Sequence, residues 1–206
     1  MEIKGSTPAS RFLVLEQEER LPFEPRILGY LRVDPPIPRM HRRTQKGIET
    51  NIRERVFPAS WFCPTFRLEE ALHEAPEELA EADWRTLTEV ALERVNTAAA
   101  RIARVVVHPD YRADGLGALL VRRALRWIAE RRIPEMRRKK HLVETVAQMS
   151  RYHPFFERVG FRYVWETASG RPVLLYPLTE TAQKRLEEFL TLDPEARPYR
   201  GRLYRP

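Results

Sequence analysis

One short segment constrains the fold of this chain more than any other, because a strand, a glycine turn and a helix follow one another directly. Residues 102–108, Ile-Ala-Arg-Val-Val-Val-His, are the most apolar strand candidate in the sequence. A turn containing Gly115 and Gly117 follows, and residues 117–132 have the apolar spacing of an amphipathic helix. A helix that begins at such a turn offers free backbone N–H groups and about half a positive charge to an anion. The segment predicts an anion-binding turn within an α/β fold.

Two common phosphate-binding motifs do not fit this turn. A Walker A loop ends in Gly-Lys-Ser/Thr, whereas the chain has Gly-Ala-Leu starting at Gly117. A dinucleotide fingerprint requires a third glycine where Leu120 stands. The remaining pattern is Arg-x-x-Gly-x-Gly at 112–117, preceded by Val-x-Pro at 107–109.

The rest of the chain alternates between strand and helix patterns, which indicates a mixed sheet. Residues 39–66 are expected to be irregular apart from a short helix near 48–56, and residues 67–95 are expected to be helical and acidic. Further strands are predicted over 11–18, 26–33, 141–147, 161–166 and 172–178. Further helices are predicted over 179–190 and over 148–159, where the alternative is a start only at Pro154, as an N1 proline.

The composition limits the class of protein. The 206 residues are 43% hydrophobic, which is enough for one compact domain with an ordinary core. No apolar run is long enough for a membrane span, and the first twenty residues lack the apolar region of a secretory signal. A single cysteine, Cys63, excludes an intrachain disulfide, and no histidine spacing suggests a metal site. We expect a cytoplasmic protein with no metal and no membrane partner.

The net charge of +7 leaves the partner open. An arginine run over residues 122–140 fits a solvated helix face, and it equally fits a surface that holds the 3′-phosphate of a nucleotide cofactor or an RNA backbone. Both interpretations remain open from the sequence.

Two motifs resemble those of a known family, the GNAT superfamily of acyl-CoA N-acyltransferases. Its acyl-CoA-binding motif resembles residues 105–121, Val-Val-Val-His-Pro-Asp-Tyr-Arg-Ala-Asp-Gly-Leu-Gly-Ala-Leu-Leu-Val, and its second motif resembles residues 154–161, Pro-Phe-Phe-Glu-Arg-Val-Gly-Phe. Residues 141–157 are similar to a bacterial subset of the family that is associated with ABC-type ATPase domains.

The resemblance implies a fold. We expect a GNAT-like α/β structure: a mixed, mainly antiparallel sheet flanked by helices, with a helical insertion before the acyl-CoA-binding strand. A single domain would span residues 1–206, made of N-terminal strands (1–38), the helical insertion (39–100), the acyl-CoA-binding core (101–178) and a C-terminal helix and tail (179–206).

The resemblance also implies an activity. It identifies an acetyltransferase in which a neutral amine of an unknown acceptor attacks the thioester of acetyl-CoA, the co-substrate, in a ternary complex. The edge of Val105, Val106 and Val107 would pair with the pantetheine arm, and the N–H of Val107 would polarise the thioester carbonyl. The pyrophosphate would be held by the backbone amides of Arg112, Ala113, Asp114, Gly115, Leu116, Gly117 and Ala118.

The catalytic side chains depart from the family pattern. A tyrosine often serves as the general acid at the second aromatic of the second motif, but that position is Phe156, which has no proton to donate. Tyr152, one helical turn earlier, is the candidate replacement. Glu144, on the strand after the long helix, is the candidate base if that strand splays away from 102–108. A structural ion pair with an arginine is the competing interpretation for Glu144.

These departures keep other functions open. The chain could serve as a non-catalytic GNAT-like module that binds CoA or RNA. It could also be an accessory subunit that docks an ATPase partner through the acidic helices at 67–83. Pairing of two copies through the strands at 161–178 would give a homo-oligomer.

Overall fold

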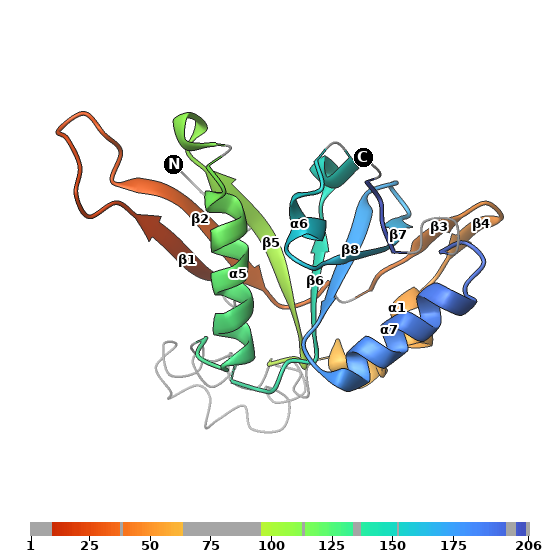
Figure 1. The fold of residues 1–206 in the computed structure, drawn as a ribbon. Coiled ribbons are helices and arrows are strands. Elements are labelled where there is room, and N and C mark those ends of the chain that lie inside the picture. Colours follow the sequence, from red (N-terminus) through yellow and green to blue (C-terminus); the bar gives the residue numbers. More distant parts are fainter. Residues whose placement is uncertain are drawn as a thin grey trace, which may run out of the picture.

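A computed structural model describes residues 10–37, 39–63, 96–112, 114–133, 137–151, 153–196 and 201–204. They form an open eight-stranded sheet with helices on both faces (Figure 1). The strand order is β1-β2-β5-β6-β8-β7-β3-β4. Of the ladders between described strands, only that of β5 and β6 is parallel. The predicted mixed, mainly antiparallel sheet is therefore confirmed.

The elements follow the alternation that the sequence indicated. The strands are β1 (Arg11–Glu16), β2 (Ile27–Asp34), β3 (Arg42–Thr44), β4 (Gly47–Glu49), β5 (Ala99–Val107), β6 (Leu142–Val146), β7 (Arg162–Thr167) and β8 (Pro172–Pro177). The α-helices are α1 (Ile52–Val56), α5 (Leu116–Ala129), α6 (Phe155–Arg158) and α7 (Glu180–Leu192), and short 3-10 turns are η1 (Ala59–Trp61), η2 (Pro109–Tyr111) and η3 (Gln148–Arg151).

Two local predictions were wrong. Residues 39–66 are not irregular throughout, because β3 and β4 form a hairpin whose first strand also pairs with β7. A continuous helix over 148–159 is also wrong, because residues 148–151 form η3 and α6 begins at Phe155 with Pro154 at its N-cap, one residue from the alternative start. Proline has no N–H to continue the helical ladder, and it favours a helix start. The helices predicted over 67–95 lie outside the described residues.

Each face of the sheet has its own hydrophobic cluster. Val143 belongs to the cluster under α5 and α6, and its neighbour Leu142 belongs to the cluster under α1 and α7. The alternation follows from the pleat, since successive strand side chains point to opposite faces. The helices therefore fix the sheet from both sides.

The order of the strands bears on how two copies of the chain could associate. β8 lies between β6 and β7, and β7 is flanked by β3, so the strands at 161–178 are interior. Both edges of each strand are occupied within the single chain, so two copies would associate here only by exchanging these strands, and the expected homo-oligomer remains a prediction. None of the described helices is both long enough and apolar enough to cross a membrane.

Candidate functional site

The two central strands, β5 and β6, pair over only three rungs and then diverge. The rungs join Ala99 to Leu142, Ala100 to Val143 and Arg101 to Glu144. One further link follows, a hydrogen bond of 3.0 Å that the hydroxyl of Thr145 donates to the carbonyl of Ile102. Figure 1 shows β5 and β6 separating from this point towards the turn that precedes α5. The splay expected for the strand of Glu144 is confirmed.

The divergence leaves one edge of β5 open. The N–H of His108 donates to the carbonyl of Leu28 on β2 over 2.7 Å. Along an antiparallel ladder, the N–H and C=O groups of successive residues point alternately towards the partner strand and away from it. His108 bonds to β2, so the N–H and C=O groups of Val107 and Val105 point away from β2. Val105 and Val107 are only half-buried although they lie in a central strand of the sheet. The carbonyl of Val107 accepts a hydrogen bond of 3.4 Å from Nε of Arg112. The N–H groups of Val105 and Val107 and the carbonyl of Val105 have no partner strand among the described residues, and such an edge suits an extended ligand that pairs like a strand.

The turn after β5 exposes the N-terminus of α5. Gly115 occupies the N-cap with φ 77°, a left-handed conformation that glycine adopts without steric cost. A Cβ built on Gly115 meets nothing within 4 Å, so the space in front of this residue is open. The N–H of Leu119 bonds to the carbonyl of Gly115, which leaves the preceding N–H groups of the first turn without a helical partner. These groups and the helix dipole favour an anion here.

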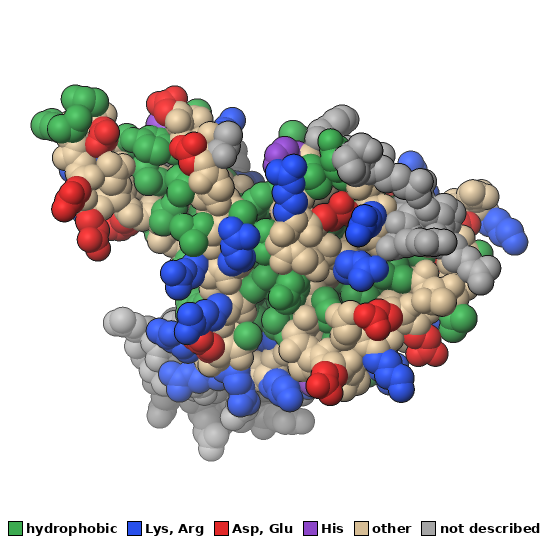
Figure 2. All heavy atoms as spheres, viewed as in Figure 1, with side chains coloured by type: hydrophobic (Ala, Val, Ile, Leu, Met, Phe, Trp, Pro, Cys, Tyr) green, Lys and Arg blue, Asp and Glu red, His purple; other side chains and the backbone are tan. Residues whose placement is uncertain are grey.

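Gly117 holds α5 close to its neighbours. A Cβ on Gly117 would lie 3.0 Å from Cε2 of Phe155 and 3.7 Å from Cγ2 of Val107. The first turn of α5 is therefore in contact with both the end of β5 and the start of α6. Figure 2 shows the surface hollowed between the tip of the β5–α5 turn and the side that carries α6.

The structure brings most of the predicted binding residues together at this edge. Val105, Val106 and Val107 form the last part of β5, and the turn and first helical turn contain Arg112, Asp114, Gly115, Leu116, Gly117 and Ala118. Ala113 and Tyr152 lie outside the described residues, so the roles expected for them remain predictions.

Glu144 is fully buried in an ion pair. Its Oε2 accepts a hydrogen bond of 2.7 Å from Arg53 of α1, and its Oε1 accepts one of 2.9 Å from the backbone N–H of Ile37. Neither side chain is more than 3% exposed. Arg53 also donates to the carbonyl of Ile37 and stacks over Phe62. Both carboxylate oxygens are thus engaged, as in the competing interpretation of this residue, and its role as a base remains a prediction.

Phe156 is buried in the cluster below α5 and α6. Its ring makes edge-on contacts with Phe155 and Phe161, whose centroids lie 4.7 and 5.2 Å away. The residue therefore packs α6 against the sheet, and it supplies no proton.

A model of one protein family matches the chain over residues 79–163, and its description is acetyltransferase (GNAT) domain. This range includes β5, the glycine turn, α5, β6 and α6. Residues 79–163 are similar to a GNAT acetyltransferase domain. The resemblance to the superfamily that the sequence motifs indicate is confirmed over this range. No curated protein matches the chain.

Solved structures with a similar arrangement include three GNAT-related proteins. A KacTA–DNA complex is 14% identical, with 91% of this chain and 77% of that chain covered and a TM-score of 0.41. AtaT complexed with acetyl-methionyl-tRNAfMet is 14% identical, with 82% and 71% covered and a TM-score of 0.40. A putative GNAT acetyltransferase from Desulfovibrio desulfuricans is 10% identical, with 82% and 70% covered and a TM-score of 0.41. At these scores the likeness carries no argument about the activity of this chain.

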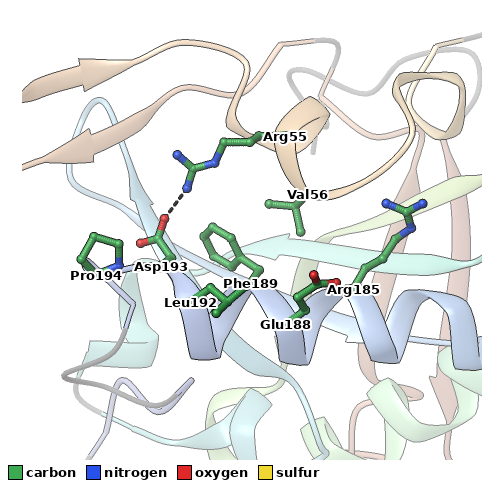
Figure 3. Close-up of a pocket in the computed structure, with 8 residues that line it drawn as sticks. All are labelled: Arg55, Val56, Arg185, Glu188, Phe189, Leu192, Asp193 and Pro194. Carbon is green, nitrogen blue, oxygen red and sulfur yellow. Dashed lines mark hydrogen bonds and ion pairs between the residues drawn. The ribbon is translucent and has the colours of Figure 1, made fainter.

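A second hollow, of about 480 Å³, lies between α1 and α7, away from the glycine turn between β5 and α5 (Figure 3). Arg55 reaches across it to Asp193, which also accepts a hydrogen bond of 2.9 Å from Arg42. Burial alone would raise the pKa of Asp193, but these two arginines and the N–H of Ala196 hold it below its ordinary value. The ion pairs tie the β3–β4 hairpin and α1 to α7, so this hollow is part of the scaffold.

Lys140 has a strongly perturbed pKa, but it lies far from the glycine turn between β5 and α5. Its ammonium donates to the carbonyl of Thr97 over 2.5 Å and to the side chain of Asn96. Burial, together with the charges of Arg138 and Arg131, lowers the pKa of Lys140 to about 7. The residue links the segments just before β5 and β6, whereas the glycine turn follows the last residue of β5. No group of three or more metal-binding side chains is found among the described residues.

Two arginines near the site, Arg53 and Arg101, were not among the candidate residues of the sequence. Arg53 lies in a short helix that the sequence placed correctly, but its partner Glu144 is 91 residues away. Arg101 precedes the strand as it was predicted, whereas β5 begins two residues earlier, at Ala99. A charged residue within so apolar a strand was the signal that could have drawn attention to it.

Proposed function

We propose that this protein is an N-acetyltransferase that transfers the acetyl group of acetyl-CoA to an amine. The observation that carries the proposal is the open edge of β5, which runs directly into the exposed N-terminus of α5. An extended thioester with a diphosphate at one end matches this succession of backbone groups. The match of the chain to the GNAT acetyltransferase family supports the same conclusion.

The diphosphate would bind at the turn. The N–H groups of Leu116, Gly117 and Ala118 point out of the first turn of α5, where the dipole favours negative charge. Glycine at 115 and 117 lets the phosphates approach the backbone. Val105 would then bond the pantetheine arm through its outward N–H and C=O groups, and Val107 through its N–H, because the carbonyl of Val107 is bonded to Arg112.

We place the thioester nearer to the start of β5 than Val107. Val107 lies against the phosphate-binding turn, since a Cβ on Gly117 would be 3.7 Å from it. The thioester is at the far end of the arm, so we place it towards the last β5–β6 rung, at Arg101. This modifies the expectation that the N–H of Val107 polarises the carbonyl. A β-bulge lies there, because Arg32 pairs with Arg104 and Val33 with Ile102, which leaves Ala103 without a partner in register.

The reaction would be a direct transfer. The lone pair of the neutral amine attacks the carbonyl carbon, a C–N bond forms, the C–S bond breaks, and the CoA thiolate leaves and takes up a proton. A backbone N–H that bonds the developing oxyanion is worth about 3–4 kcal/mol. The amine must also lose a proton. We propose that water at the open β5 edge accepts it, because the carboxylate of Glu144 is bonded on both oxygens.

The proposal is tested by thermal unfolding with and without acetyl-CoA. A hundredfold excess over Kd stabilises a protein by about 2.7 kcal/mol, which corresponds to a rise in Tm of about 5–11 °C for a chain of this size. We expect such a rise with acetyl-CoA and with free CoA, since both carry the diphosphate and the arm. Dephosphorylated pantetheine is the control, and it should produce a much smaller rise. The absence of a rise with both CoA compounds would contradict the proposed site.

A second candidate function is supported by the surface of α5. Figure 2 shows basic side chains gathered over the lower half of this helix and the segment after it. Arg122 and Arg137 are exposed, and Glu130 already pairs with Arg126 and Arg132. A continuous basic surface of this kind suits the phosphate backbone of RNA.

The RNA function predicts a steep dependence on salt. A single-stranded RNA should bind with an affinity whose log–log slope against salt is about −0.7 for each phosphate neutralised. The double variant Arg122→Gln/Arg137→Gln should reduce the slope by about 1.4, as measured by fluorescence anisotropy at several salt concentrations. Arg26→Gln, a change at a side chain that is 68% exposed on the β1–β2 hairpin, is the control. An unchanged slope would remove α5 from RNA binding.

A further inference from the structure

A row of charged side chains crosses the sheet where β5 and β6 begin to diverge. Asp34 of β2 is opposite Arg101 of β5, and Arg101 is opposite Glu144 of β6. Residues directly opposite one another project from the same face of a sheet. This is the face of α1, because Glu144 is paired with Arg53 of that helix.

Both carboxylates of this row already have partners. Asp34 accepts a hydrogen bond of 2.7 Å from the hydroxyl of Ser10 and forms an ion pair of 3.0 Å with Arg32. Glu144 is held by Arg53 and by the N–H of Ile37, at 2.7 and 2.9 Å. Neither acid can turn towards Arg101 without giving up these bonds.

Arg101 is left without a partner in this row. Its side chain is half-buried, and it makes no hydrogen bond or ion pair with any residue that the structure describes. Its Nε is buried and unbonded. Burial of an unpaired polar or charged group costs free energy, so such a group requires an explanation. A bound anion would remove this cost, because the planar guanidinium can donate two parallel hydrogen bonds to one carboxylate or phosphate.

The position of Arg101 separates it from the cofactor phosphates. Arg101 lies six residues before Val107, and Val107 contacts the phosphate-binding turn. At the rise of a strand, Arg101 is therefore about 20 Å from that turn. It occupies the last rung before the open edge, which is where the thioester would lie. Arg104, exposed on the same strand, adds a second cation nearby. An anion at Arg101 is therefore a different group from the CoA diphosphate.

We propose that Arg101 binds a carboxylate or phosphate group of the acceptor and so holds the acceptor amine at the thioester. The inference rests on the proposed acetyl transfer and specifies its substrate class: an amine that carries an anionic group a short distance from the nitrogen.

The test compares amines with and without an anionic group. β-Alanine is matched with 3-aminopropanamide, and 2-aminoethyl phosphate is matched with ethanolamine. Binding of each is measured by calorimetry to the whole protein, both alone and saturated with CoA. We expect the anionic member of at least one pair to bind about 10- to 100-fold more tightly, the range for hydrogen bonds to a charged group. The pair with the larger ratio distinguishes a carboxylate from a phosphate.

Variants locate the effect. Arg101→Gln should abolish the preference for the anionic member, Arg101→Lys should keep part of it, and Arg26→Gln should keep all of it. Arg101→Gln should retain the affinity for acetyl-CoA and a Tm equal to or above that of the wild type, because an unpaired charge has been removed. Equal affinities within both pairs, a preference that survives in Arg101→Gln, or a lower Tm for that variant would overturn the inference. A wild-type protein that fails to bind acetyl-CoA would contradict the proposed function instead, and the measurements without CoA would still decide the role of Arg101.

Discussion

Replacing Arg53 with methionine is expected to lower the free energy of unfolding by about 3–5 kcal/mol, the range for removing one partner of a buried ion pair. The change leaves the carboxylate of Glu144 with no exposure to water and without its charged partner. It also leaves the carbonyl of Ile37 without the guanidinium that bonds it. Urea unfolding followed by circular dichroism measures the loss. Arg26→Met, in which a 68% exposed side chain is changed, should alter stability by less than about 1 kcal/mol.

The double variant Arg53→Met/Glu144→Leu keeps this prediction testable if the single variant does not fold. Removing both charges avoids an unpaired buried charge, although the N–H and the carbonyl of Ile37 lose their side-chain partners. The double variant should therefore recover part of the stability. If it is no more stable than Arg53→Met, the ion pair is not what makes the single change costly. The same protein tests Glu144 as a base. Acetyl transfer that persists without this carboxylate would reject that role.

Replacing Gly117 with leucine is expected to weaken acetyl-CoA binding at least about 100-fold, equivalent to about 2.7 kcal/mol, without unfolding the protein. The new Cβ would be 3.0 Å from the ring of Phe155, so the larger side chain must displace that ring or enter the space in front of α5. The diphosphate would occupy that space. Calorimetric titration measures the affinity, and circular dichroism verifies the fold.

The double variant Gly117→Leu/Phe155→Ala separates these two effects. It gives the leucine room beside α6 and relieves the contact with the ring. Binding that stays weak would show that access to the helix N-terminus is what matters. Binding that returns to the wild-type value would assign Gly117 to packing and contradict the diphosphate site.

The features that could be predicted from the sequence are local. β5, the glycine turn and α5 follow one another along the chain, and the apolar spacing of each is its own signal. The β3–β4 hairpin was missed because residues 42–49 have no apolar alternation. It forms because β3 adds to the edge of β7, which no local pattern reveals.

The features of the site that could not be predicted depend on distant pairs. The open edge of Val105 and Val107 exists because β6 pairs with only three residues of β5, whereas its whole length, Leu142–Val146, pairs with β8. The partner of Glu144 comes from 91 residues earlier in the chain. Arg101 is one of many arginines in the sequence. Only its neighbours in register, whose carboxylates are bonded to other residues, show that its charge is unpaired within the described part of the chain.

The three residue pairs between β5 and β6 separate the residues proposed for the cofactor from those proposed for the acceptor, and the two groups differ in how they are distributed along the chain. The groups proposed for the cofactor come from one continuous stretch, from Val105 to Ala118, so a single short segment preserves cofactor use. The charged row and the arginine that pairs with its Glu144 draw on four separate segments, at Asp34, Arg53, Arg101 and Glu144. Arg101 can therefore be substituted without touching the residues from Val105 to Ala118. A mutant library that varies Arg101 and keeps the Arg53–Glu144 pair intact is the efficient way to change the acceptor while the donor stays the same.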